Sequence, residues 1–382
     1  MRWLSGNEAF SLEQIQNQIY HRVDENQFNN KYYLTVNTRA LFNRKRELEL
    51  INKDVIDKLG SIKNLIQQLM KSDRAIESII KIDHDLKCLR NTRLEHDLVH
   101  DAVTEEILKE EELCKEKLKL NKKCIERVKQ QLNELKEAKQ RVEYDWSCKK
   151  DAYHIDTGCL ALNNSSKNLE WKPGCAQLPA GQCTPVGHEQ FTEESIAYAQ
   201  IAINRSRVLK TTIRDHINKL VKDLLLQACQ VDISLTNKFN ETDQACRRLE
   251  QALLECSKSL ADSEKVIINT SKAIRKLDAP SKCAQTRLSM RLERHNIEHC
   301  RDVPQFRIVI NLIDELKDIS VGVSALSTKI NNTKNITETL DKSYKKIQHE
   351  IMVKRKSLWI DGERCRLLRS FYPSEQTLYG YQ

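Results

Sequence analysis

Hydrophobic residues recur every three or four positions through long stretches of this chain, with charged residues between them. The spacing is clearest just after the middle of the chain. There the apolar positions are Ile213, Ile217, Leu220, Leu224, Ala228, Val231, Leu235, Phe239, Thr242, Cys246, Leu249, Leu253, Cys256 and Leu260. Steps of three and four keep one narrow apolar stripe along a helix, which predicts coiled-coil packing.

Two other stretches repeat this spacing. One holds Leu316, Ile319, Val323, Leu326, Ile330, Leu340, Tyr344, Ile347 and Ile351. The other holds Leu48, Ile51, Val55, Leu59, Ile62, Ile66 and Leu69. At a rise of ~1.5 Å per residue, ~120 helical residues span roughly 180 Å. We therefore expect two long helical arms that lie antiparallel and bury their stripes against each other.

Glycine and proline gather in two places and divide the chain. Between residues 31 and 150 there is no proline and only one glycine, Gly60, and residues 188–279 contain neither. The main cluster comprises Gly158, Pro173, Gly174, Pro179, Gly181, Pro185 and Gly187. A second break spans Pro280 to Pro304, where Asp278-Ala279-Pro280 predicts the end of the preceding helix.

These patterns predict an all-α protein, a long antiparallel coiled-coil rod. The expected segments are an N-terminal segment at 1–30, a first helical half at 31–155, a connecting loop at 156–191, a second-half helix at 192–279, a short helix and loop at 280–303, a final long helix at 304–360 and a C-terminal tail at 361–382. The short helix is expected over 281–293. Asp302 is expected to cap the next helix, with Gln305 completing a capping box.

Composition favours the same fold class. Charged residues make up 31% of the 382 residues and aromatic residues 5%, with 9 glycines and 6 prolines. Such a chain is typical of long helices rather than of a compact globule. No apolar run approaches the ~20 residues that span a membrane, and the start, MRWLSGNEAFSLEQ, lacks the apolar core of a signal peptide. We expect an intracellular, cytoplasmic protein with no membrane partner.

The chain has 13 cysteines. In a reducing compartment they are expected to be free thiols that pack as small apolar side chains. No C-x-x-C pair is present. Cys159, Cys175, Cys183 and His188 share one flexible segment, but their spacing matches no standard zinc finger. We expect no bound metal.

The net charge is +9, with acidic residues between the basic ones throughout. Mixed charge of this kind is typical of solvated helix faces. The excess is compatible with an acidic polymer, and tubulin and nucleic acid both qualify. A nucleic-acid binder needs a clustered Lys/Arg face, ideally with aromatic side chains for stacking. The nearest approach, Arg44 to Arg46, is too short, so we expect no nucleic-acid partner.

Two stretches carry histidines in patterns that invite comparison with enzymes. EHDLVHD places His96 and His100 on one face of a helix, but the Glu of H-E-x-x-H and a third ligand are missing. In RHNIEHCRD, Cys300 follows His299, yet adjacent loop residues point apart and no glycines form an oxyanion hole. Neither a P-loop nor a G-x-G-x-x-G fingerprint is present. We therefore expect no catalytic residue, no cofactor and no enzymatic activity.

The second of these stretches also carries a family resemblance. RHNIEHCRD, from Arg294 to Asp302, resembles the signature nonapeptide of tektins, Arg-Pro-Asn-Val-Glu-Leu-Cys-Arg-Asp. The matching residues are Arg294, Asn296, Glu298, Cys300, Arg301 and Asp302, whereas His295, Ile297 and His299 replace Pro, Val and Leu. Further segments resemble tektins as well, namely AQTRLSMR just before the nonapeptide, KSLWIDGERCRLLR near the end, DLVHDAV at 97–103 and IDTGCLAL at 155–162.

The resemblance implies a fold, a function and a set of partners. Tektins are filament-forming proteins of ciliary and flagellar doublet microtubules, built from four main helical segments joined by loops. A protein of this kind is a microtubule inner protein that stabilises and stiffens the doublet and supports motility of the cilium or flagellum. The implied partners are other tektins, tubulin and further microtubule inner proteins, and the implied location is the cytoskeleton, in the axoneme of the cilium or flagellum. The nonapeptide residues Arg294, His295, Asn296, Ile297, Glu298, His299, Cys300, Arg301 and Asp302 would form an interaction loop between filament subunits.

Two other interpretations stay open. On physical grounds alone, the nonapeptide is equally a hinge filled with polar residues. A generic coiled-coil scaffold or adaptor, not confined to axonemes, has the same helical pattern but gives no reason for the nine-residue loop. The replacement of Pro by His295 removes a fixed φ and adds an N–H group, which favours a divergent member with its own choice of neighbours.

Overall fold

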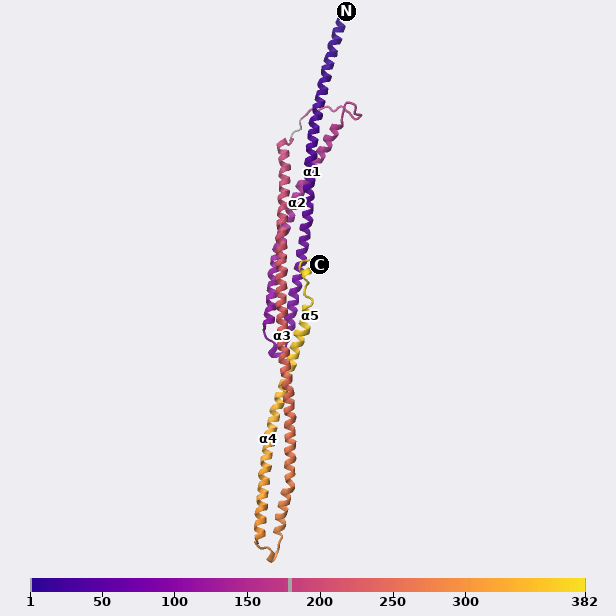
Figure 1. Ribbon diagram of the computed structural model, residues 1–382. Coiled ribbons are helices and arrows are strands. Elements are labelled where there is room, and N and C mark those ends of the chain that lie inside the picture. Colours follow the sequence, from indigo (N-terminus) through magenta and orange to yellow (C-terminus); the bar gives the residue numbers. More distant parts are fainter. Residues whose placement is uncertain (1, 178–180, 302, 382) are drawn as a thin grey trace. The chain divides into compact units, whose positions relative to one another are not determined.

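The computed structural model describes residues 2–177, 181–301 and 303–381. The long helices are α1 (Arg2–Arg90), α2 (Ala102–Ala161), α3 (Pro185–Leu292) and α4 (Val303–Trp359), shown in Figure 1. The short elements are the 3-10 helices η1 (Glu95–Asp97) and η2 (Asn296–Glu298), the π-helix η3 (Ile360–Cys365), and the helices α5 (Arg366–Arg369) and α6 (Glu375–Leu378). The described residues contain no strand, which confirms an all-α protein of four main helical segments joined by loops.

The chain divides into two compact units. Unit 1 comprises Met1–Ile80, Glu111–Leu226 and Pro373–Gln382, and unit 2 comprises Lys81–Glu110 and Gln227–Tyr372. Helices α1, α2 and α3 each contribute a stretch to both units, whereas α4 belongs to unit 2 alone. Each unit therefore has its own core.

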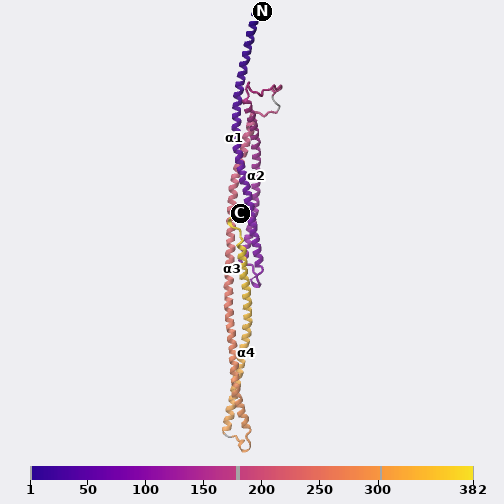
Figure 2. The same cartoon turned by 90° about the vertical axis from the view of Figure 1, so that its right-hand side faces the viewer.

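In unit 1, α1, α2 and α3 lie side by side, as Figures 1 and 2 show. The amide of Asn37 in α1 donates a hydrogen bond of 2.7 Å to Asp156 of α2. Gln131 of α2 donates one of 3.1 Å to the carbonyl of Ala202 in α3. The apolar stripe predicted for the first half is inside, and its buried members are Leu48, Val55, Leu59, Ile62 and Leu69.

In unit 2, α3 and α4 form a long hairpin. Arg355 of α4 donates to Glu250 of α3 at 2.7 Å. Where the ends of α1 and α2 join the hairpin, a core cluster forms from Ile82, Leu86, Val103, Ile107, Val231, Leu235, Ile360 and Cys365. Along the remaining hairpin the stripe residues Leu326, Ile330 and Ile347 are half-buried, because two helices enclose an apolar stripe less completely than three.

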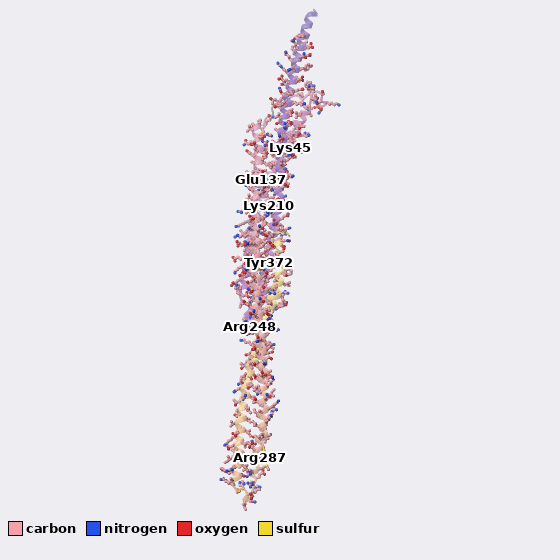
Figure 3. The ribbon with its side chains drawn as sticks, viewed as in Figure 1. Lys45, Glu137, Lys210, Arg248, Arg287 and Tyr372 are labelled. Atoms are coloured by element: carbon pink, nitrogen blue, oxygen red, sulfur yellow. The ribbon has the colours of Figure 1, made fainter. Side chains whose placement is uncertain are left out.

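Charged side chains project along the helices of both units, including Lys45, Glu137, Lys210, Arg248 and Arg287, which Figure 3 labels. Many pair within one helix, as Lys345 does with Asp341 at 2.6 Å. Such exposed pairs contribute only about 0.3–0.5 kcal/mol each, so the stripes hold the helices together. Within the described ranges, no helix has both the length and the apolar character to cross a membrane.

The first half is not one uninterrupted helical arm, contrary to the prediction for 31–155. Helix α1 ends at Arg90 and α2 begins at Ala102, although the residues between them include neither glycine nor proline. Glu95 has a φ of 45°, a conformation that few non-glycine residues adopt, and the chain reverses there. His96 and His100 therefore lie outside the α-helices, and the expectation that they share a helical face is wrong.

The helix end predicted at Asp278-Ala279-Pro280 is also wrong. Helix α3 continues through Pro280 to Leu292, so no separate helix forms over 281–293. A proline removes one backbone hydrogen bond from a helix interior, and Pro280 is exposed, where water can bond to the freed carbonyl. The connecting loop is shorter than the predicted 156–191, since α2 extends to Ala161 and α3 begins at Pro185.

The C-terminal residues after 360 are folded rather than a loose tail. In unit 2, η3 buries Asp361 and Cys365. In unit 1, Gln68 of α1 donates a hydrogen bond of 2.8 Å to the carbonyl of Tyr379. Gly380 has a φ of 76°, and a Cβ at that position would lie 2.2 Å from the carbonyl oxygen of Gln68. The close approach of this turn to α1 therefore requires glycine.

Candidate functional site

The predicted interaction loop connects α3 to α4 within unit 2 (Figure 1). The structure describes Arg294 to Arg301, whereas Asp302, with its predicted capping role, lies outside the described residues. We call residues 293–301 the second corner. Its side chains are exposed or half-buried, and Ile297 is 92% exposed.

Hydrogen bonds within the second corner fix its backbone. Asn296 has a φ of 51°, and its carbonyl accepts a hydrogen bond of 3.1 Å from the N–H of His299. Arg294 donates to Glu298 at 3.1 Å. The Nδ1 of His299 lies 3.0 Å from the carbonyl oxygen of Arg294, a distance at which a protonated Nδ1 donates to it. The corner is thus a defined turn rather than a loose hinge.

A turn of the same design, which the sequence analysis missed, joins α1 to α2. We call residues 91–101 the first corner. Its pattern is Arg90-x2-Arg93-x-Glu95-x-Asp97-x3-Asp101, and the pattern of the nonapeptide region is Arg291-x2-Arg294-x-Asn296-x-Glu298-x3-Asp302. Both corners place a 3-10 helix after an extended residue, give its first residue a positive φ and close on that residue's carbonyl. The signal that reveals the first corner is this repeated spacing of arginines and acids.

Arg93 holds the first corner together from inside. Its Nε donates to the carbonyl of Arg90 and its Nη2 to the carbonyl of Val99, both at 3.0 Å. Its Nη1 donates to Asp101 at 3.1 Å. Asp101 also accepts a 3.1 Å hydrogen bond from the backbone N–H of Thr104 and so caps the start of α2. One arginine and one aspartate thereby tie both ends of the turn.

Arg90 connects the first corner to the C-terminal end of the hairpin in unit 2. Its guanidinium donates to Asp101 at 2.6 Å and to Asp361 at 3.0 Å. The side chains of Arg90 and Asp361 are 2% and 3% exposed. A charge pair removed from water in this way needs both partners, because a single buried charge costs several kcal/mol.

The acidic residues of the first corner bind α4. Asp97 accepts hydrogen bonds from the ammonium group of Lys354 and, at 2.7 Å, from the hydroxyl of Ser357. Glu95 lies 2.8 Å from the Nε2 of His349. We call the surface formed by His349, Lys354, Ser357 and Asp361 the seat of the first corner.

The pKa values of Asp97 in the first corner and of Asp361 in its seat are shifted in opposite directions. Burial alone would raise the pKa of Asp97, but the hydrogen bonds from Lys354 and Ser357 outweigh burial and hold that pKa below its ordinary value. The pKa of Asp361 is raised, because burial outweighs the attraction of Arg90. Burial, followed by the charge of Asp361, raises the pKa of the Cys365 thiol to about 12.

Arg369 is a second buried arginine with several partners in unit 2. Arg369 donates to Glu110 at 2.7 Å, to Asp232 at 2.8 Å and to the carbonyl of Ala228 at 3.0 Å. Burial raises the pKa of Glu110 despite the neighbouring charge of Arg369. These contacts join the end of α5 to α2 near its start and to the middle of α3, so they fix the packing of these three helices.

The residues weighed for chemistry are not assembled into a reactive site. Cys159, Cys175 and Cys183 are exposed free thiols, and the Nε2 of His188 lies 3.5 Å from the Nζ of Lys149. The ring of His299 faces a backbone carbonyl, while Cys300 is an exposed free thiol. Among the described residues, no group of three or more His, Cys, Asp or Glu side chains is arranged to hold a metal ion.

Known proteins are similar in sequence to this chain over most of its length. The sequence pattern of the Tektin family matches residues 5–373. Tektin-4 of Bos taurus is 31% identical over 340 residues, which cover 87% of this chain and 74% of that protein. Tektin-4 of Rattus norvegicus is 31% identical with 86% and 73% covered, and Tektin-4 of Homo sapiens is 29% identical with 83% and 73% covered. The four-segment fold, the nonapeptide corner and these matches agree, and the chain belongs to the tektin family.

Proposed function

We propose that this protein is a filament-forming subunit that lies inside the doublet microtubules of cilia or flagella, where it stabilises and stiffens them and supports motility. The family is a structural, non-enzymatic one. The proposed partners are other tektins, tubulin and further microtubule inner proteins. The proposed mechanism is mechanical: paired helices resist bending, and docking between subunits continues the filament.

The observation that carries the proposal is the exposed second corner. Its backbone is fixed by internal hydrogen bonds, yet Ile297, Cys300 and Arg301 are exposed. A rigid turn with exposed apolar and charged side chains suits docking, because little conformational entropy is lost when it binds. The chain has a net charge of +9, and this positive excess suits lateral contact with the acidic surface of tubulin.

Charge reversal at Arg301 tests the docking role. Arg301→Glu changes an exposed side chain outside both apolar stripes, so we expect helicity by circular dichroism to stay unchanged. Association between subunits should weaken by about tenfold or more, because a like charge then faces the partner. The measurement is sedimentation of assembled filaments together with electron microscopy. Arg248→Glu, the same charge change at an exposed position of α3 far along the chain from the corner (Figure 3), is the matched control.

The location in the doublet needs its own test. Cilia or sperm tails are stripped with detergent and salt, and the protein is followed by immunoblotting in each fraction. We expect it to remain with the doublet walls after membrane and matrix proteins have left. Release with the soluble fraction would favour a generic coiled-coil scaffold. Normal filament formation by Arg301→Glu would contradict the docking role and favour the interpretation of the second corner as a hinge.

A further inference from the structure

The two corners of this chain repeat one design, and so do the segments that end α2 and α4. The first corner contacts the segment Lys354-x5-Ile360-Asp361. The same pattern occurs at the end of α2, as Lys149-x5-Ile155-Asp156. We propose that the second corner of one subunit docks on the α2 segment 149–156 of a second copy, with Arg291 paired to Asp156. This inference rests on the proposed filament function and specifies its contact.

Unit 2 supplies the template for this contact. Arg90, in the last turn of α1, pairs with Asp361 at 3.0 Å, and both side chains are buried. Arg291 occupies the equivalent place before the second corner, three residues ahead of Arg294 as Arg90 is ahead of Arg93. Asp156 follows Ile155 as Asp361 follows Ile360. Both partners of the proposed pair therefore have counterparts that already pair within this chain.

Within the described part of the chain, neither Arg291 nor Asp156 forms an ion pair with an oppositely charged side chain. Arg291 is half-buried, and its Nε donates to the amide oxygen of Gln305 at 2.5 Å rather than to a carboxylate. Asp156 is half-buried and accepts from the amide of Asn37 at 2.7 Å, and no cation pairs with it there. A guanidinium and a carboxylate in such positions are complementary.

An apolar pair beside the charges shows the same relation. In unit 2, Leu89 packs against the core cluster that contains Ile360, which is 0% exposed. The counterparts are Met290, which is 64% exposed, and Ile155, which is 63% exposed. Contact between Met290 of one copy and Ile155 of the next would remove both from water, as the template contact does for Ile360.

One part of the template does not carry over. Lys354 binds Asp97 in the seat, but its counterpart Lys149 is buried in unit 1, where it donates to Asp145 at 2.7 Å and to Thr192 at 2.6 Å. Glu298, the counterpart of Asp97, therefore has no free lysine at this position. The proposal accordingly depends on Arg291 and Asp156.

The contact joins two different surfaces of the same chain. A contact of this heterologous kind does not close on itself as a two-fold dimer does, and repetition produces an open row of subunits when the rotation between neighbours does not close a ring. The second corner of each copy is then covered by the α2 segment of the next. This is the symmetry that a filament requires.

Charge exchange between two full-length variants tests the pair. Arg291→Asp and Asp156→Arg are each expected to lower the sedimenting fraction at least about tenfold, because each places like charges in the contact. An equimolar mixture should recover sedimentation. When the two variants alternate along a row, every contact is complementary, since the introduced aspartate faces the introduced arginine and the native arginine faces the native aspartate. Circular dichroism of each variant checks that the helices are intact.

Matched controls are Arg248→Asp and Asp151→Arg, which reverse charges at exposed positions of α3 and α2. They should sediment as the unmodified protein does, alone and mixed. If Arg291→Asp and Asp156→Arg also sediment normally, or if their mixture fails to recover, the pairing is overturned while filament formation stands. If the unmodified protein forms no end-to-end assemblies, the proposed function and the pairing both fall.

Discussion

The first and second corners share a backbone path and a residue pattern but differ in their surroundings. Arg90, directly before the first corner, and Arg93 within it are buried and paired with Asp101 and Asp361. In the second, Arg294 pairs only with the exposed Glu298 of its own turn among the described residues. The pattern therefore encodes the turn, and the neighbouring helices decide whether its charges are buried in the fold or stay on the surface.

The largest difference in stability between the two corners is expected when the buried Arg90 is replaced. Arg90→Ala leaves Asp361 and Asp101 without their shared cation in a buried site. We expect the free energy of unfolding to fall by about 3–5 kcal/mol, measured by urea denaturation followed by circular dichroism. Arg291→Ala, at the equivalent place before the second corner, should cost less than about 1 kcal/mol. Equal costs at the two positions would mean that the corners are not differently embedded.

A second, smaller difference is expected between two glycines. Gly362 follows Asp361, and Gly158 lies two residues after Asp156. A Cβ on Gly362 would lie 2.6 Å from the ring of Phe239, whereas a Cβ on Gly158 meets nothing within 4 Å. Gly362→Ala should therefore destabilise the protein by about 1–3 kcal/mol, because the ring must shift. Gly158→Ala should stabilise it by about 0.5–1 kcal/mol, since alanine favours a helix interior. Thermal unfolding of the two variants distinguishes the outcomes, and destabilisation by both would contradict an open surface at the end of α2.

The smallest expected effect depends on pH. The pKa of Asp97 is lowered in the folded state, so its contribution to stability is fully present above the unfolded-state pKa of about 3.9. That contribution is lost as the pH falls through the lower folded-state pKa. The difference in unfolding free energy between the unmodified protein and Asp97→Asn should be about 1 kcal/mol at pH 7 and should vanish below that window.

Comparison with one variant isolates Asp97 from other titrating groups. Glu110 and Asp361 have raised pKa values, so their protonation favours the folded state as the pH falls, and this effect is common to both proteins. Glu298→Gln, the matched change in the second corner, removes an exposed ion pair with Arg294 and should cost less than about 0.5 kcal/mol at pH 7. A constant difference for Asp97→Asn would show that its carboxylate does not act through its charge.

Most of the helical framework could be predicted from the spacing of apolar residues. Ile217, Leu224 and Val231, chosen on spacing alone, are buried. Spacing predicts which face of a helix is covered, because the period of the helix is fixed. It does not reveal how many helices cover that face, so the three helices of unit 1 and the two-helix hairpin of unit 2 have the same signature.

The breaks in the helices were harder to predict because glycine and proline are imperfect markers. The first corner reverses the chain at Glu95 with neither residue present, and α3 continues through Pro280. In the first case charged side chains determine the turn; in the second, solvent exposure tolerates a missing hydrogen bond. The repeated arginine and acid spacing was the available signal for the first corner.

The position of the candidate site in the sequence could be predicted, but the contacts between residues far apart in the chain could not. Arg294 and Glu298 lie in a connecting turn, as the nonapeptide resemblance implied, and their docking role remains a prediction. The seat of the first corner joins residues far apart in the sequence, such as Asp97 and Lys354. Spacing along one helix contains no information about such pairs, so only the folded chain reveals them.

The burial of Cys365 has a consequence for the chemistry of this cysteine-rich chain. Thiolates, not thiols, react with oxidants and alkylating agents. Cys365 has a pKa of about 12 and is 0% exposed, whereas Cys88, Cys159 and Cys300 are exposed. The exposed sulfurs can be oxidised while the fold is intact. Modification of Cys365 requires the core of unit 2 to open first. The extent to which this thiol is modified therefore measures how often the core has opened.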